Sequence, residues 1–397
     1  MSLPVLTVAR MREWEQSTWA AGQTEAAVIA RVGEAIARLA LRLTHDGDRI
    51  LILAGKGHNG DDVRAAQKIL SGRTVELLDV ATPETELAKL ETALKLRPQL
   101  IIDGLFGIGL NRALSPEWIQ FISRVNEARR PVLAVDVPSG LNADTGEHFG
   151  AAISATVTLT IGAPKQGLLR ATAGPFVGRL EAAADVGLTA SPNSTELRWL
   201  QADDFEEFPP LRKAALHKGS FGHAALLAGS LGYHGAAVLA ARGAQRAQPG
   251  LITVLTHADA YFPIAAQLQS AMVGIWSENM TLPANCTALL VGPGLAAANL
   301  PTGMKMMTRR FWRDLQVPLI VDASGLDWLA LEPFPRHTIR VLTPHPGEAA
   351  RLLKATPQQV QADRPRALRE ISRSFGNCWV VLKGHQTLIG RSEGEIF

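Results

Sequence analysis

Residues 49–62 read RILILAGKGHNGDD, an apolar run that passes directly into a glycine-rich turn and two aspartates. A short, continuous apolar run bounded by glycines is typical of a strand that is buried on both faces. Helical periodicity follows from Val63 to Leu70, so this part of the chain predicts a strand, a turn and a helix in succession. Because glycines let backbone N–H groups approach an anion at a helix N-terminus, the turn is a candidate ligand-binding loop.

The same kind of apolar run recurs along the chain, with helical periodicity between the runs. In the first half, the predicted strands are 49–54, 74–80, 99–103, 131–137 and 156–161. In the second half, they are 223–228, 251–255, 288–291, 318–322, 340–343 and 379–383. Continuous apolar strands separated by helices predict parallel sheets covered on both faces. We therefore predict two α/β domains, 1–190 and 213–397, joined by a linker over 191–212 that lacks sustained periodicity.

The composition excludes several classes of protein. Of 397 residues, 47% are hydrophobic and 19% are charged, which excludes disorder and is enough for two cores. The net charge is only +3 and the basic residues are scattered, so nucleic-acid binding is not expected. No run is apolar enough for a membrane helix and the N-terminus lacks a signal-peptide pattern, so we expect a cytoplasmic protein without membrane contact. Cys286 and Cys378 lack CxxC spacing, which argues against structural zinc.

Two further strands of the first half end in an aspartate followed by a glycine-containing loop. Asp103 opens the string DGLFGIGL, and Asp136 opens the string DVPSGL. A lone aspartate after a strand is commonly a turn former, but three strand ends of this kind together indicate a site. In an open parallel sheet the carboxyl ends of the strands form the ligand crevice. One edge of the sheet is therefore expected to carry Asn59, Asp62, Asp103, Asp136 and Ser139.

The ordered strings GKGHNGDD, DGLFGIGL, DVPSGLNADTG and IGAPKQGLL resemble the NAD(P)H-hydrate epimerase domain over residues 1–190. The resemblance implies a Rossmann-like domain that interconverts the R and S epimers of hydrated NADH and NADPH. It implies that Asn59, Asp103 and Ser139 hold a potassium ion and that Asp136 is the catalytic residue at the hydrated nicotinamide. The implied substrate contacts are His58, Asn59, Gly60, Asp61, Asp62, Gly107, Ile108, Gly109, Leu110, Asn111 and Arg112.

The chemistry of these residues agrees with that interpretation. A hard monovalent cation prefers oxygen ligands, which amide, carboxylate and hydroxyl side chains supply. Epimerising a carbon that bears a hydroxyl next to a ring nitrogen requires either loss and return of water or ring opening and closure. Both routes need a carboxylate that moves a proton, and Asp136 is our choice. The loop departs from the family pattern GxGNNGGDG at His58, Asp61 and Val63; Asp61 adds a charge near the expected ligand, and a helix-capping role for it stays open.

The second half contains the strings HKGSFGHAALLAGSLGYHG, LLVGPGL, VDASGLDWL, LTPHPGEAARLL and VVLKGHQTLIG, which resemble the ADP- or ATP-dependent NAD(P)H-hydrate dehydratase. The resemblance implies a ribokinase-like fold in which Ala236, Gly294 and His345 contact the hydrated dinucleotide. For His345, between two prolines, a rigid surface turn is the alternative. The implied adenine-nucleotide loop, which would take ADP or ATP with Mg²⁺, is Lys383, Gly384, His385, Gln386 and Thr387.

That family continues with a glycine-rich GxGD segment, whereas this chain stops at Phe397 before such a segment. The segment supplies an anion hole and a base, and losing both costs many orders of magnitude in rate. We therefore predict a C-terminally truncated dehydratase domain with impaired dehydration, apolar surface left on one face of its sheet, and an intact epimerase domain. The alternative is that the sequence is a fragment of a longer protein, in which case the loss of dehydratase activity does not follow.

The interpretation is thus a metabolite-repair enzyme acting on a small molecule, and the resemblance implies a homo-oligomer. Three alternatives remain. The GxGxxG spacing of residues 55–60 with Asp79 about 20 residues on favours an NAD-dependent dehydrogenase. The second half favours a ribokinase-like small-molecule kinase. The domain that resembles the epimerase could also bind nucleotides without turnover, as a non-catalytic binding protein.

Overall fold

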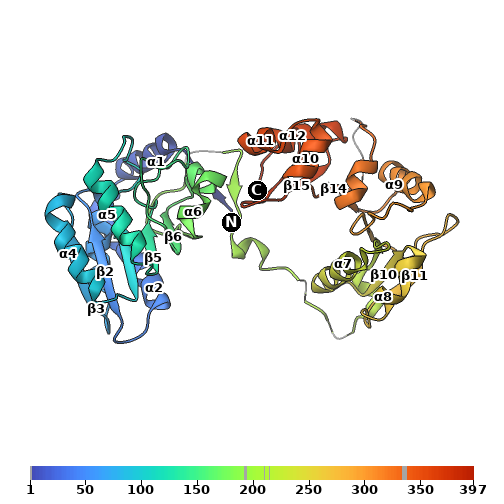
Figure 1. The fold of residues 1–397 in the computed structure, drawn as a ribbon, viewed down its shortest axis with the longest axis horizontal. Coiled ribbons are helices and arrows are strands. Elements are labelled where there is room, and N and C mark those ends of the chain that lie inside the picture. The colour runs from blue at the N-terminus through green and yellow to red at the C-terminus, as the bar shows by residue number, and fades with distance from the viewer. Residues whose placement is uncertain (1, 192–194, 210, 214, 333–337) are drawn as a thin grey trace. The chain divides into compact units, whose positions relative to one another are not determined.

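The computed structural model describes residues 2–191, 195–209, 211–213, 215–332 and 338–397. The chain divides into two compact units, Met1–Leu200 and Gln201–Phe397 (Figure 1). The segment predicted as a linker is divided between them. Part of it forms a short strand, β8 (Arg198–Trp199), which pairs antiparallel with β1 (Leu3–Pro4) in the first unit.

The first unit is built on a six-stranded sheet in which every neighbouring pair is parallel. Its strands, in spatial order, are β3 (Thr74–Asp79), β2 (Arg49–Ala54), β4 (Leu100–Gly104), β5 (Val132–Val135), β6 (Val157–Ile161) and β7 (Arg179–Ala183). Ala54 at the end of β2 lies opposite Asp79 of β3 and Gly104 of β4. This register brings the carboxyl ends of the three strands to one edge.

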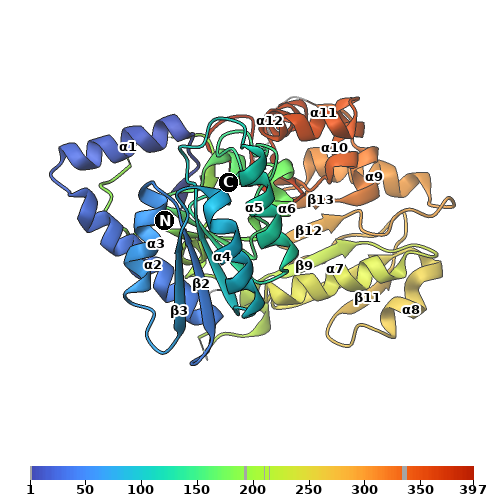
Figure 2. The same ribbon diagram turned by 60° about the vertical axis from the view of Figure 1, so that its left-hand side comes forward.

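Helices cover both faces of this sheet because each strand presents apolar side chains on both sides. Ile50 and Ile52 of β2 belong to the core formed with α2 (Glu25–Leu43) and α3 (His58–Gln67). Leu51 and Leu53 belong to the core formed with α4 (Pro83–Lys95) and α5 (Pro116–Glu127), which lie in front of the sheet in Figure 2. A separate small core joins Met11 and Trp14 of α1 (Val8–Ala20) to the rest of the unit.

The second unit is built on an eight-stranded sheet, parallel except for the last strand. In spatial order it contains β11 (Met272–Ile275), β10 (Leu251–Thr256), β9 (His223–Leu227), β12 (Ala288–Val291), β13 (Leu319–Val321), β14 (Arg340–Leu342), β15 (Trp379–Leu382) and β16 (Leu388–Gly390). The described helices are α7 (His234–Arg246), α8 (Tyr261–Ala265), α9 (Thr302–Asp314), α10 (Pro346–Leu353), α11 (Pro357–Ala362) and α12 (Arg364–Ser374).

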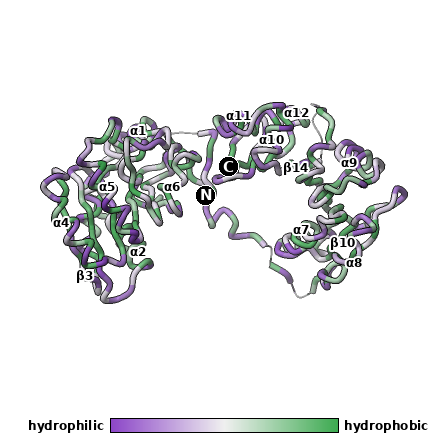
Figure 3. Tube along the Cα trace, viewed as in Figure 1, coloured by the Kyte–Doolittle hydropathy of each residue, from purple (hydrophilic) through white to green (hydrophobic). Residues whose placement is uncertain are grey.

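The two faces of the second sheet differ in burial. Leu289, Leu319 and Leu342 are fully buried, whereas Leu290 and Ile320, which point to the opposite face, are half-buried. On that opposite face, α7 and α8 pack over β9 and β10, so the half-buried row begins at β12. The hydropathy colouring shows apolar residues concentrated in the strands and alternating with polar residues in the helices (Figure 3).

The prediction of parallel-sheet α/β units is confirmed, and every predicted strand is present with bounds that differ by at most two residues. Five strands were not predicted: β1, β7, β8, β11 and β16. They lie at the edges of their sheets, where alternate side chains meet solvent and the apolar signal is weak. Among the described residues, no helix is both long and apolar enough to cross a membrane.

Candidate active site

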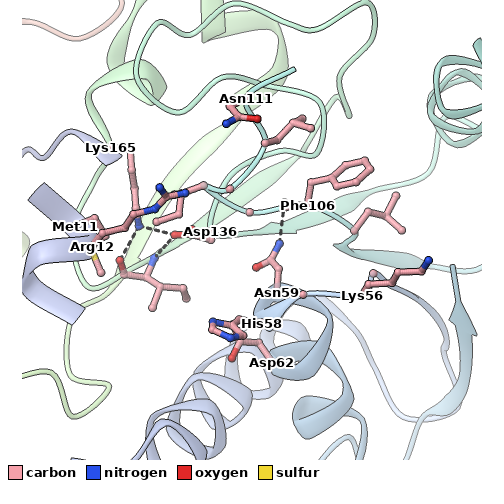
Figure 4. A pocket seen from close by; sticks show the side chains of 18 of the residues that line it. Met11, Arg12, Lys56, His58, Asn59, Asp62, Phe106, Asn111, Asp136 and Lys165 are labelled. Atoms are coloured by element: carbon pink, nitrogen blue, oxygen red, sulfur yellow. Dashed lines mark hydrogen bonds and ion pairs between the residues drawn. The ribbon is translucent and has the colours of Figure 1, made fainter. Parts of the chain in front are cut away.

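The carboxyl ends of β2, β4, β5 and β6 surround a cavity of about 820 Å³ in the first unit (Figure 4). This volume lies in the range of small-molecule and cofactor sites. The predicted site residues in its wall are His58, Asn59, Asp62, Gly107, Ile108, Gly109, Leu110, Asn111, Arg112 and Asp136. The fold thus brings together three segments that are far apart in the sequence.

Two glycines of the first loop are required by close backbone contacts. A Cβ atom on Gly55 would lie 2.0 Å from the carbonyl oxygen of Leu105, and one on Gly60 would lie 2.0 Å from the carbonyl oxygen of Gly55. Gly57, by contrast, is the N-cap of α3 and has open space where a Cβ would be. The first and last glycines of the fingerprint therefore let α3 pack tightly against the strand ends.

Asn59, Asp103 and Ser139 meet beside the backbone of Phe106. Ser139 Oγ donates a hydrogen bond to Asp103 Oδ1 at 2.6 Å, and the Ser139 backbone N–H donates to Oδ2 at 2.9 Å. The Asn59 amide donates to the Phe106 carbonyl at 2.9 Å, and the Phe106 N–H donates to Ser139 Oγ at 2.9 Å. Burial raises the pKa of Asp103 to about 6, against the hydrogen bonds from Ser139 and Leu105. The buried Asp103 carboxyl is thus held by Ser139 and the Leu105 backbone, and Asn59 is held nearby through the Phe106 carbonyl.

Asp136 is held by a buried lysine. Lys165 Nζ donates to Asp136 Oδ1 at 2.5 Å, and the Ile161 backbone N–H donates to the same oxygen at 3.1 Å. Oδ2 lies on the loop side, 3.7 Å from where a Cβ on Gly107 would be. The backbone φ of Asp136 is 65°, in the left-handed region that non-glycine residues rarely adopt. One carboxylate oxygen is therefore fixed by the protein while the other faces the cavity.

Two further carboxyl groups in the cavity wall have shifted titration. Burial, with Asp136 as the next largest contribution, raises the pKa of Asp62 to about 8. Burial also raises the pKa of Glu15, although Lys165 opposes this shift. Asp62 is on α3 and Glu15 on α1, so two helices contribute acidic groups to one cavity. Such perturbed groups in a cavity are typical of functional sites.

The cavity wall also contains cations. Arg12 and Lys56 lie in the wall together with the glycine-containing loop 107–112, which ends in Arg112. A concave surface lined by several positive charges attracts anions and increases their local concentration. This part of the cavity is suited to the phosphates of a dinucleotide.

Gly60 and Asp61, predicted as substrate contacts, are not in the cavity wall. Asp61 Oδ1 instead accepts a hydrogen bond from Arg64 at 3.0 Å. Arg64 also donates to Asp79 Oδ1 at 2.7 Å and to the Gly55 carbonyl at 2.9 Å. The extra charge at position 61 is therefore compensated within the protein. The dehydrogenase alternative depends on Asp79, and the carboxylate of Asp79 is already hydrogen-bonded to Arg64.

Four charged residues of the cavity wall were not identified from the sequence: Arg12, Glu15, Lys56 and Lys165. Lys165 lies within the string IGAPKQGLL, which carried the resemblance but no assigned role. A lysine with no exposed surface is rare unless it is paired, so only the three-dimensional structure indicates its function. Arg12 and Glu15 come from α1, whose periodicity predicts packing rather than binding.

In the second unit, Ala236 and Gly294 are neighbours. A Cβ on Gly294 would lie 3.0 Å from the Cβ of Ala236 and 2.5 Å from the Tyr233 carbonyl oxygen. Ser230 Oγ donates to the Gly294 carbonyl at 2.6 Å. The loops after β9 and β12 therefore contact each other, and a side chain at position 294 would obstruct that contact.

The predicted nucleotide loop begins beside His345. The Lys383 backbone N–H donates to the carbonyl of Pro344 at 2.9 Å, and His345 is the N-cap of α10. The Lys383 ammonium lies 2.8 Å from Asp322 Oδ1 and 3.9 Å from Glu348 Oε2. The ends of β13, β14 and β15 thus place one cation between two carboxylates.

Arg364 supports the remainder of this loop, residues 384–387. Its guanidinium donates to the backbone carbonyl of Gln386 at 2.6 Å and to that of Leu382 at 2.9 Å. Arg364 Nε is buried without a hydrogen-bond partner among the described residues, and burial lowers the pKa of this arginine. Gly384, His385 and Thr387 lie in the same loop. Hydrogen bonds from Arg364, a residue that was not predicted to belong to the site, therefore stabilise the backbone of this loop.

Two parallel-sheet units, each with polar groups gathered at its strand ends, define an α/β enzyme of the nucleotide-handling class. The family model described as YjeF-related protein N-terminus matches residues 75–167, and that described as NAD(P)H-hydrate dehydratase matches residues 224–397. The bifunctional NAD(P)H-hydrate repair enzyme Nnr of Coxiella burnetii is 31% identical over 96% of this chain and 82% of that protein. The chain belongs to the family of bifunctional NAD(P)H-hydrate repair enzymes, which combine an epimerase with an ADP/ATP-dependent dehydratase.

Two further relatives carry the same name as the Coxiella protein. The enzyme of the same name from Moorella thermoacetica is 33% identical over 88% of this chain and 74% of that protein. The one from Escherichia coli is 30% identical over 93% and 75%. A solved structure, the ADP/ATP-dependent NAD(P)H-hydrate dehydratase from Bacillus subtilis co-crystallised with ATP/Mg²⁺, is 30% identical over 47% of this chain and 67% of that chain, with a TM-score of 0.42. The predicted C-terminal truncation is not supported by the alignment with the Coxiella protein.

Proposed function

We propose that the cavity of the first unit is the epimerase site, where the R and S epimers of hydrated NADH and NADPH are interconverted. The observation that carries this proposal is the arrangement of Asp136. Its Oδ1 is fixed by Lys165, and its Oδ2 faces a cavity large enough for a nucleotide. A carboxylate with one oxygen fixed and one available is suited to proton transfer.

The reaction exchanges a hydroxyl group at a carbon next to the ring nitrogen. When the hydroxyl takes up a proton and leaves as water, the ring nitrogen shares its electron pair with that carbon, and a water that adds to the opposite face gives the other epimer. The incoming water must lose a proton, and Asp136 accepts it through Oδ2. The cations Arg12, Lys56 and Arg112 and the loop 107–112 hold the phosphates of the substrate, which orients its ring toward Asp136.

We propose that Asn59, Asp103 and Ser139 hold potassium. The donor set supports this assignment, because the three side chains converge on the Phe106 backbone and carry a single carboxyl. The Asn59 amide nitrogen donates to the carbonyls of Phe106 and Val135, which leaves the amide oxygen as the atom available to a cation. Potassium would supply a fixed positive charge beside the loop that begins at Gly107.

For the second unit we propose ADP- or ATP-dependent dehydration of the S epimer. Lys383 and Arg364 support phosphate binding at the loop 384–387. Asp322 and Glu348 lie within 4 Å of Lys383 Nζ and would suit a Mg²⁺ ion that arrives with the phosphates. The proposed contacts of the hydrated dinucleotide are Ala236 on α7, Gly294 after β12 and His345 after β14.

The cytoplasmic location and the homo-oligomeric state stay predictions from the sequence. Size-exclusion chromatography with light scattering tests the second, and a monomer at working concentration would contradict it.

The epimerase proposal is tested by giving purified protein the separated R epimer of NADH hydrate, with potassium and without adenine nucleotide. We expect the S epimer to appear faster than it does spontaneously. Asp136→Asn should lower the catalysed rate by about 10²–10⁴-fold, the usual contribution of a positioned acid or base. A folded protein that does not accelerate the interconversion would overturn the proposal and favour a binding protein.

A further inference from the structure

Asp62 is a buried carboxyl group that the mechanism so far does not use. It lies on the first turns of α3, is 8% exposed, and forms part of the cavity wall. No hydrogen bond or ion pair joins its carboxyl to any other described residue. Its carboxyl oxygens are not among the fully buried atoms that lack a partner in the described part of the chain, so they open onto the cavity, where a ligand can reach them.

Asp62 and Asp136 lie on different sides of the same cavity. Asp62 belongs to α3, and Asp136 follows β5; Figure 4 shows them on the helix side and the strand-end side. Their surroundings are opposite in character. Asp136 is paired with the ammonium of Lys165, whereas Asp62 has no cation bonded to it among the described residues. The two carboxyl groups of one site thereby have different partners.

We infer that Asp62 is a second catalytic carboxyl of the epimerase, which gives a proton to the departing hydroxyl while Asp136 takes one from the water that replaces it. This inference rests on the proposed function. Epimerisation needs groups on both faces of the reacting carbon, because the hydroxyl leaves from one face and returns to the other. Residues from α3 and from the strand ends can meet that requirement, whereas one carboxylate on one side cannot.

The step is balanced without a further reactant. The Asp62 carboxylic acid transfers its proton to the hydroxyl, the C–O bond breaks, and water leaves with that electron pair. Water then attacks the opposite face of the cationic ring, a C–O bond forms, and its surplus proton passes to Asp136. Asp62 ends as a carboxylate and Asp136 as an acid, the correct states for the reverse conversion. Exchange of protons with solvent restores the starting states, and no redox change occurs.

The charges around Asp62 support its role as an acid at neutral pH. Burial is the largest cause of its raised pKa, and four other carboxyl groups add to it: Asp136, Asp61, Glu15 and Glu25. Among the cations, Lys165 is bonded to Asp136, and His58 of α3 pairs with Glu25. A carboxyl group whose pKa is raised by an apolar site commonly serves as the acid of an enzyme.

The test compares Asp62→Asn with wild type on the separated R epimer. Asparagine has the size of a neutral aspartic acid but has no acidic proton, so a merely structural role would be preserved. We expect kcat to fall by about 10²–10³-fold with a small change in KM. The matched control is Asp79→Asn, which removes a carboxyl group outside the cavity wall and should keep the wild-type rate.

The pH dependence of kcat/KM provides a second measurement that needs no variant. The wild-type value should decline as pH rises through about 8, because the acid must be protonated in the free enzyme. Asp62→Glu should restore part of the rate lost in Asp62→Asn. An active wild type without this alkaline decline, or an Asp62→Asn variant at full rate, overturns the inference alone. An inactive, folded wild type overturns the proposed function and this inference together.

Discussion

The ammonium of Lys165 lies 2.5 Å from Oδ1 of Asp136, and Lys165 has no exposed surface. Its remaining hydrogen bonds go to the Ile161 carbonyl at 2.8 Å and to Thr160 Oγ1 at 3.3 Å. All three partners are parts of the chain that shape the site. This one side chain therefore links the stability of the first unit to the geometry of its catalytic carboxylate.

We predict that Lys165→Met lowers the free energy of unfolding by about 3–5 kcal/mol, because it leaves a buried carboxylate without its counter-charge. Adding Asp136→Asn should recover part of this loss, with a coupling of about 1–3 kcal/mol in a double-mutant cycle. Urea denaturation of wild type, both single variants and the double variant measures it. Strictly additive losses would show that the two groups are not coupled.

Asp62 should make the stability depend on pH. Its pKa is about 8 in the folded protein against an ordinary value of 3.8, so the folded state holds the proton more tightly than the unfolded chain. The stability that this group contributes is therefore complete below about pH 4 and is lost as pH rises toward 8. Asp62→Asn should remove this loss. In denaturation measurements, we expect the free energy of unfolding of Asp62→Asn, relative to that of wild type, to be higher at pH 8 than at pH 5. The same difference between the two proteins at both pH values would contradict the prediction.

Replacing potassium with lithium at constant ionic strength should lower the epimerase rate. Lithium is smaller than potassium, so the carbonyl of Phe106 and the side chains around that carbonyl cannot all reach the lithium ion. Asn59→Ala should weaken the dependence of the rate on potassium concentration. The measurement is the initial rate against KCl, with the ionic strength balanced by tetramethylammonium chloride. An initial rate that does not depend on the identity or concentration of the cation would contradict a role for potassium in the proposed mechanism.

Lys383→Met should weaken binding of ATP with Mg²⁺ by about 10-fold or more, since a hydrogen bond to a charged group contributes roughly 1.5–3 kcal/mol. Isothermal titration calorimetry of the full chain measures the affinity. Lys305→Met, on α9, removes a lysine that contacts the Trp328 ring and should leave the affinity unchanged. Equal affinity of Lys383→Met and Lys305→Met for ATP with Mg²⁺ would show that the phosphates do not bind at Lys383.

The apolar strands could be predicted because each is a short apolar run between helical segments, as in β2, where five of six residues are buried. The edge strand β11 could not be predicted, because Met272 and Ile275 are exposed and its residues do not alternate between buried and exposed. Edge strands depend on pairing with a neighbour, and that pairing is a property of the tertiary structure.

The site could be predicted as far as strand ends determine it. Asp103, Asp136 and Ser139 follow buried strands, so the sheet alone brings them together. Lys165 and Glu15 could not be predicted as site residues, because nothing in local sequence indicates that a lysine is buried or that a helix end reaches the cavity. The partner of Asp61 was missed for the same reason.

The left-handed backbone of Asp136 limits what can replace it. Most side chains cost about 1–2 kcal/mol in that conformation, and asparagine is among the few that tolerate it. Changes to residues other than asparagine, glycine and glutamate therefore lose the carboxylate and strain the backbone at once. A lineage that gave up the chemistry but kept the nucleotide would pass most easily through asparagine. A relative with intact strand ends and asparagine at this position would thus be recognisable as a former enzyme that now only binds.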